Sequence, residues 1–126
     1  MVISYDNLED FFGMQIDLLC LLRQDIIPKK LSGKPKKFFV YCIILNAEGY
    51  DINSTDAVEK LRDYMGFKIN DDVYTYRYKL KSQGWLVAEK NNSKRFKILP
   101  MFDFQGKDLH TLKDYKFQLK YATPAV

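Results

Sequence analysis

The sequence has few of the residues that metal binding and thiol chemistry require. It contains one histidine, His110, and two cysteines, Cys20 and Cys42, which form no CxxC motif and have no histidine nearby. A zinc site needs several such ligands at short spacing, so we expect no metal site. Both cysteines fall within apolar helical patterns, so we expect them to be buried and reduced. A disulfide between them is an alternative that the spacing does not support.

The motifs of common catalytic sites are missing as well. The sequence has no phosphate-binding glycine loop and no G-x-S-x-G motif. Its adjacent carboxylates, Asp71 with Asp72 and Glu9 with Asp10, would point about 100° apart on a helix, which is a poor geometry for shared acid–base work. We therefore expect a protein that is not an enzyme and uses no cofactor.

Long uninterrupted hydrophobic runs are also absent. The first apolar run, residues 11–27, follows several acidic residues and is interrupted by Asp17, Arg23 and Asp25. These charges argue against a secretory signal and against a membrane span. A chain of 126 residues with 47% hydrophobic residues can bury the core of one domain without disulfide or metal support. We expect a single cytoplasmic domain over residues 1–126.

The basic residues are concentrated in two segments. Residues 28–38 contain five lysines and no acid, and residues 68–98 contain eight basic residues against three acidic ones. Each segment therefore has a net charge of +5, while the whole chain has only +4. If the two segments converge on one face, that face would suit a polyanion. The alternative is a set of solvated lysines on an inert surface.

The segment from residue 70 to residue 84 predicts a basic helix. Asn70 is a suitable N-cap, two aspartates follow where the helix dipole favours anions, and Gly84 can end the helix in the left-handed conformation. Val73, Tyr76 and Leu80 recur at helical spacing and are expected to face the core. This arrangement turns outward the aromatic, hydroxyl and basic residues Tyr74, Thr75, Arg77, Tyr78, Lys79 and Lys81.

Three further elements are predicted before this helix. Residues 6–27 have apolar residues at mostly helical spacing and predict an amphipathic helix. Residues 28–35 contain two prolines, a glycine and a serine, which indicates a connection. The apolar run from about 36 to 46 favours a buried helix, with a buried strand as the alternative. Residues 49–53 predict a short strand.

The next helix should begin at a cap formed by Ser54 or Thr55 and end at Gly66, and only three residues separate Gly66 from Asn70. Two short helices joined so tightly are typical of a helix-turn-helix. After Gly84 the pattern alternates, with a polar turn at residues 90–94, and predicts a β-hairpin that Pro100 ends. In the tail we favour a strand from about 114 to 122, although a helix also fits.

The sequence resembles a winged helix-turn-helix domain, a broad family that includes MarR-like and phage or plasmid regulators. The resemblance covers about residues 36–100 and rests on Val73-x-x-Tyr76-x-x-x-Leu80-x-x-x-Gly84-Trp85-Leu86. It implies a mainly α protein with a small β-sheet, that is, the α+β class. Its parts would be an N-terminal helix with a basic linker (1–34), a winged-helix core (35–100) and a C-terminal extension (101–126).

The resemblance also implies sequence-specific binding of double-stranded DNA. The helix over residues 71–83 would enter the major groove, and the hairpin over residues 86–99 would form a wing on the backbone or in the minor groove. The backbone amides of Ser54 and Thr55, at the start of the preceding helix, could bind a phosphate. The implied DNA-binding residues are Ser54, Thr55, Tyr74, Thr75, Arg77, Tyr78, Lys79, Lys81, Lys94 and Arg95. Accessory contacts are assigned to Lys34, Lys36 and Lys37.

The biological role within this function is left open. The protein would be a transcriptional regulator, or it would bind a replication or partition site of a phage, plasmid or mobile element. A homodimer through the N-terminal helix or the C-terminal extension is expected. The alternative is a winged-helix module that binds another protein and not DNA, because tyrosine is favoured at protein interfaces and several tyrosines lie in or near the motif.

Overall fold

The computed structural model describes residues 2–4, 8–22, 31–105 and 116–118. The described elements, in chain order, are β1 (Val2–Ser4), α1 (Leu8–Leu22), α2 (Gly33–Ala47), α3 (Thr55–Met65), α4 (Asn70–Ser82), β2 (Leu86–Glu89), β3 (Asn92–Ile98), the 3-10 turn η1 (Pro100–Phe102) and β4 (Lys116–Gln118). Four helices followed by a two-stranded antiparallel hairpin confirm the mainly helical α+β class. This order is compatible with a winged helix-turn-helix.

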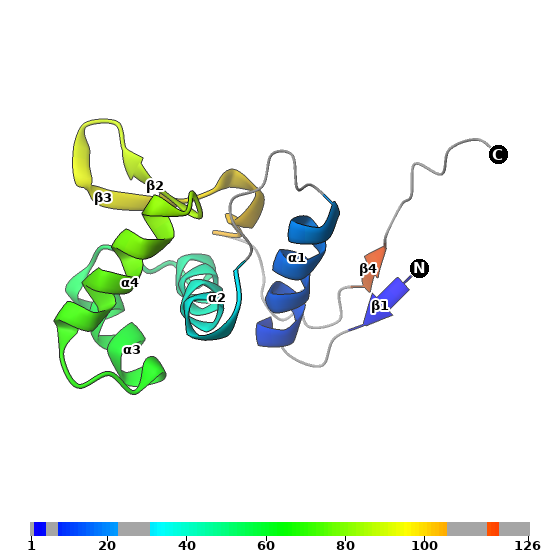
Figure 1. Ribbon diagram of the computed structural model, residues 1–126, viewed down its shortest axis with the longest axis horizontal. Coiled ribbons are helices and arrows are strands. Elements are labelled where there is room, and N and C mark those ends of the chain that lie inside the picture. Colours follow the sequence, from blue (N-terminus) through cyan, green and yellow to red (C-terminus); the bar gives the residue numbers. More distant parts are fainter. Residues whose placement is uncertain (1, 5–7, 23–30, 106–115, 119–126) are drawn as a thin grey trace.

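Helix α2 lies at the centre of the structure, between α1 on one side and α3 and α4 on the other (Figure 1). Eight of its fifteen residues are buried, which explains why its sequence is apolar almost all round. Phe39 packs against Trp85 and Phe102, with ring centroids 5.4 and 5.3 Å apart, and so joins α2 to the segments that flank the hairpin. The prediction of a helix in place of a buried strand is confirmed.

The ends of α3 follow the local signals in the sequence. The Ser54 hydroxyl accepts a hydrogen bond from the Ala57 amide at 3.1 Å and caps the helix, while Gly66 ends it at a φ of 73°. Helix α4 likewise ends just before Gly84, whose φ is 85°. Only glycine adopts this left-handed conformation without strain. The capping residue Ser54 and the two terminating glycines are therefore confirmed.

Two predictions near these helices are wrong. Residues 49–53 form turns and irregular backbone where a short strand was expected. Asn70 is the first residue of α4 and not its N-cap: Ile69 occupies the cap position in an extended conformation without a side-chain bond. The Asn70 carboxamide instead accepts a hydrogen bond from Arg62 of α3 at 3.1 Å, so it connects the two helices.

Strands β2 and β3 form the predicted antiparallel hairpin, with Leu86 opposite Ile98 and Ala88 opposite Phe96. A register irregularity follows Ala88. The predicted turn over 90–94 is shorter in the structure, because β3 already begins at Asn92.

A second pair of strands joins the two ends of the chain. Strand β4 lies within the predicted strand 114–122 and pairs antiparallel with β1, which the sequence pattern did not predict. The remainder of that predicted strand lies outside the described residues, as do residues 6, 7 and 23–27 of the predicted first helix. None of the described helices is long and apolar enough to cross a membrane.

Candidate nucleic-acid interface

The outward face of α4 has aromatic, hydroxyl and basic side chains next to one another. Tyr74 is 39% exposed and Tyr78 is 48% exposed, and Thr75, Lys79 and Lys81 are also exposed. The opposite face is buried through Val73 and Leu80. The structure therefore gathers five of the six predicted helix-face residues on one exposed surface, which we call the α4 face: Tyr74, Thr75, Tyr78, Lys79 and Lys81.

Arg77 does not belong to the α4 face, so its predicted outward orientation is wrong. It is only 6% exposed, and its Nη1 donates a hydrogen bond to the Ile52 carbonyl at 3.1 Å. The guanidinium lies over the rings of Tyr74 and Phe96, at 4.9 and 5.6 Å from their centroids. Burial lowers the pKa of Arg77 below its usual value, although nearby groups partly offset this effect.

The spacing of α4 contains a signal for this burial. Val73, Arg77 and Leu80 stand at positions i, i+4 and i+7, which is one face of a helix. Arg77 was predicted to be exposed because it is charged, although its spacing matches that of the buried residues. Because a planar guanidinium can pack between rings and satisfy a backbone carbonyl, arginine tolerates such a position.

The hairpin has exposed lysines and one arginine that is held by carboxylates. Lys90 and Lys94 are exposed. Arg95, however, lies in β3 and not in the turn, and its guanidinium pairs with Asp51 at 2.7 Å and with Glu89 at 3.4 Å. These two acids offset its charge. The sequence predicted Arg95 to be a free cation at the tip of the hairpin, whereas the structure shows it paired with two carboxylates.

Hydrogen bonds within this cluster shift the pKa values of both partners. Burial of Asp51 raises the pKa of its carboxyl, but bonds from Arg95 and Asn53 outweigh this effect, so the pKa lies below the usual value. The bond to Asp51 in turn raises the pKa of Arg95. Both groups are thus charged at neutral pH, and the pair fixes the hairpin against the loop that precedes α3.

Asn53 makes a further connection that the sequence analysis missed. Its Oδ1 accepts from the Phe96 amide and its Nδ2 donates to the Phe96 carbonyl, both at 2.8 Å. A neighbouring strand would bond an edge residue in the same paired manner. The Asn53 side chain thus makes the pair of backbone bonds to β3 that a strand at 49–53 would have made. No local pattern indicates this role, because the partner lies 43 residues away.

Ser54 and Thr55 lie at the start of α3, as predicted. The Ser54 hydroxyl is already engaged, since it accepts from the Ala57 amide and donates to the Asp51 carbonyl at 2.7 Å. Thr55 is exposed as the first residue of the helix. Of the two, Thr55 is therefore the one whose side chain is accessible to a ligand.

The lysines at the start of α2 lie close to α1 and α3. Lys36 pairs with Asp17 of α1 at 2.8 Å, and the Lys37 ammonium lies 5.0 Å from the centre of the Tyr64 ring of α3. Lys34 is exposed in the first turn. Lys36 and Lys37 also line a groove of about 500 Å³ together with acidic residues of α1. These contacts join Lys36 and Lys37 to α1 and α3 and not to the α4 face, and Lys29 and Lys30 lie outside the described residues, so the convergence of the two basic segments stays a prediction.

The two cysteines are free thiols. Cys42 is buried, and burial raises its pKa to about 12, while Cys20 is half-buried. Within the described ranges, no three histidine, cysteine or acidic side chains are grouped so that they could hold a metal ion. Comparisons of the chain with protein-family models, with curated proteins and with solved structures gave no match.

Proposed function

We propose that this protein binds double-stranded DNA as a winged helix-turn-helix, with α4 as the recognition helix and the β2–β3 hairpin as the wing. The observation that carries the proposal is the α4 face, on which two exposed tyrosines, a threonine and two lysines lie beside one another. DNA binding requires cations for the phosphates and side chains that reach base edges. The α4 face contains both kinds.

In this proposal the two ends of α4 have different tasks. Tyr74 and Thr75, in the N-terminal half, would approach the bases, because the N-terminal residues of a recognition helix usually enter the major groove. A threonine methyl group can contact the methyl group of thymine. Lys79 and Lys81, towards the C-terminal end, would bind phosphates. Arg77 would hold the helix against the loop and read no base.

The wing would contribute through Lys90 and Lys94, on the backbone or in the minor groove. Two features oppose tight binding. Asp71 and Asp72 lie in the first turn of α4, where they repel a phosphate, and Arg95 is already paired with carboxylates. We therefore expect an affinity that depends mainly on α4 and falls steeply with salt.

The test is a titration of fluorescently labelled random-sequence duplex at several salt concentrations. We expect the double variant Lys79→Glu with Lys81→Glu to lose about tenfold or more in affinity, and the salt dependence to fall by about 0.9 per lost phosphate contact. Lys60→Glu is the control: it reverses one lysine on α3, half the change of charge, at a site where the ammonium lies 5.1 Å from the Tyr50 ring centre. Equal binding by both variants would overturn the proposal.

Arg77 provides a second, sharper test. Arg77→Met preserves much of the length and apolar contact of the side chain but removes its charge. If Arg77 only positions α4, the folded variant should bind random duplex with nearly unchanged salt dependence. A fall in the salt slope by one contact, in a variant whose circular dichroism is unchanged, would instead place Arg77 on the DNA.

The competing proposal is a winged helix that binds another protein through the exposed tyrosines Tyr74 and Tyr78. Retention on a heparin column distinguishes the two: a DNA-binding face should be retained at low salt and released as salt rises. Absence of retention, together with no shift of random duplex, would favour the protein-binding alternative. Selection of a bound sequence from a random pool would then test sequence specificity. Sedimentation analysis would test the expected homodimer.

A further inference from the structure

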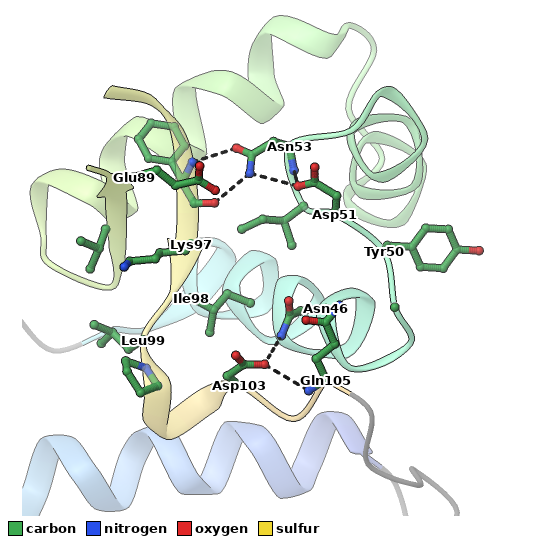
Figure 2. A pocket seen from close by; sticks show the side chains of 15 residues that line it. Asn46, Tyr50, Asp51, Asn53, Glu89, Lys97, Ile98, Leu99, Asp103 and Gln105 are labelled. Atoms are coloured by element: carbon green, nitrogen blue, oxygen red, sulfur yellow. Dashed lines mark hydrogen bonds between the residues drawn. The ribbon is translucent and has the colours of Figure 1, made fainter. Parts of the chain in front are cut away.

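A groove of about 670 Å³ lies between β3 and the loop that joins α2 to α3 (Figure 2). Side-chain bridges cross it at two places. The Asn53 carboxamide bonds the backbone of Phe96, and Asn46 donates to Asp103 at 2.9 Å. Ile98 projects from β3 between these two bridges (Figure 2). The groove is therefore bordered along one side by a strand.

The edge of β3 that faces this groove has backbone groups available for pairing. Phe96 stands opposite Ala88, yet its N–H and C=O bond the Asn53 side chain on the other side. In an antiparallel pair, alternate residues direct their backbone groups to the same side. The N–H and C=O of Ile98 therefore also point away from β2 and into the groove. Within the described ranges, β3 has β2 as its only strand neighbour.

The groove has an apolar floor and charged residues in its lining. Ile52, Ile98, Leu99 and Pro100 contribute apolar surface. The charged residues that line the groove are the acids Asp51, Glu89 and Asp103 and the base Lys97. Asp51 and Glu89 are already paired with Arg95, so among the described residues Asp103 is the acid of this lining that has no cationic partner; it accepts hydrogen bonds from the Asn46 side chain and the Gln105 amide. A partner that matches it would supply a cation.

We propose that this groove binds an extended basic peptide segment of another protein, which adds to the free edge of β3. The backbone of the peptide would bond the N–H and C=O of Ile98, as strand addition to a sheet edge does. Its apolar side chains would cover the floor, and a lysine or arginine side chain at an alternate position would reach the Asp103 carboxylate. To extend the pairing as far as Phe96, the peptide would displace the Asn53 carboxamide.

This surface is separate from the α4 face, so the proposal does not depend on DNA binding. The two are nevertheless connected, because Arg77 of α4 bonds the carbonyl of Ile52, a residue that lines the groove. A peptide in the groove would thus contact the loop to which α4 is attached.

The experiment titrates the full chain with three short peptides and follows the backbone amides by NMR. The first peptide alternates lysine and valine, the second alternates glutamate and valine, and the third is the first with methylated backbone nitrogens. We expect the lysine peptide to bind about tenfold tighter than each of the others. Its binding should shift the Ile98 amide and slow its hydrogen exchange. Methylation keeps the charge and removes the hydrogen-bond donors, so it tests strand addition separately from electrostatics.

Two variants with the same change of charge complete the test. Asp103→Asn, in the groove, should weaken binding of the lysine peptide by several-fold, whereas Asp71→Asn, in the first turn of α4, should leave it unchanged. Equal affinity for the methylated peptide, equal weakening by both variants, or shifts that avoid Ile98 would each overturn the proposal. Absence of binding at millimolar peptide would overturn it as well.

Discussion

Removal of the Asn53 carboxamide should destabilise the protein by about 2 kcal/mol. Asn53→Ala deletes two hydrogen bonds of 2.8 Å to the backbone of Phe96, and each such bond contributes about 1 kcal/mol net. These bonds join the loop before α3 to the hairpin. For a domain of this size the loss corresponds to a fall in Tm of about 6 to 10 °C.

The assay is chemical denaturation followed by tryptophan fluorescence, since the single tryptophan, Trp85, is fully buried beside the hairpin. Asn46→Ala is the matched control, because it removes one exposed side-chain bond, to Asp103, and should cost about 0.5 kcal/mol or less. If the two variants lose the same stability, the view of Asn53 as a replacement for a strand is wrong.

Asn53→Asp sharpens the same prediction. Aspartate keeps the acceptor for the Phe96 amide but loses the donor to the Phe96 carbonyl. It also places a carboxylate where the Asn53 Nδ2 now donates to Asp51 Oδ1 at 3.1 Å. The two carboxylates repel each other at neutral pH. We expect Asn53→Asp to be at least as unstable as Asn53→Ala at pH 7 and to recover part of the loss when acid protonates one carboxyl.

Three other predictions concern single groups. Folding lowers the pKa of Asp51, so its contribution to the free energy of unfolding is present above the unfolded pKa of about 3.9 and is lost as the pH falls through the folded pKa. In denaturation at several pH values, the stability difference between the parent protein and Asp51→Asn should therefore shrink below about pH 4. Cys42 is buried and its pKa is raised to about 12, so a disulfide reagent should modify Cys20 first and Cys42 only after unfolding, as measured by mass spectrometry. Rapid modification of Cys42 in the native protein would contradict its burial. Gly84→Ala should cost about 1 kcal/mol in thermal denaturation, because Gly84 has a φ of 85°, and an unchanged Tm would refute that argument.

The predictions that the structure confirmed depend on signals that act over a few residues. Ser54 caps α3 through an amide three positions away, and the glycines end helices where a left-handed residue is needed. The hairpin follows from alternation around a short polar turn. Such features are local because the interacting groups are already held close together by the chain. The single-domain organisation stays a prediction.

The predictions that failed depend on partners far away in the sequence. Arg95 pairs with Asp51 across 44 positions, and Arg77 bonds Ile52 across 25. Residue type and spacing alone predicted both arginines to be available for DNA. The spacing of α4 indicates the inward position of Arg77, but the partners of both arginines depend on how α4, the hairpin and the loop before α3 pack together, which no short pattern specifies.

The sequence by itself determined the number and order of the helices after residue 30, the ends of α3, the end of α4 and the hairpin, because propensity, capping and periodicity act within a turn or two of the backbone. Only the tertiary structure decided which charged residues remain exposed. A cation becomes buried or paired when distant elements meet around it, and that depends on the packing of α2 against its neighbours. The helical spacing placed Arg77 on the inward side of α4, but its bond to the Ile52 carbonyl and the pairing of Arg95 with Asp51 depend on how distant elements pack.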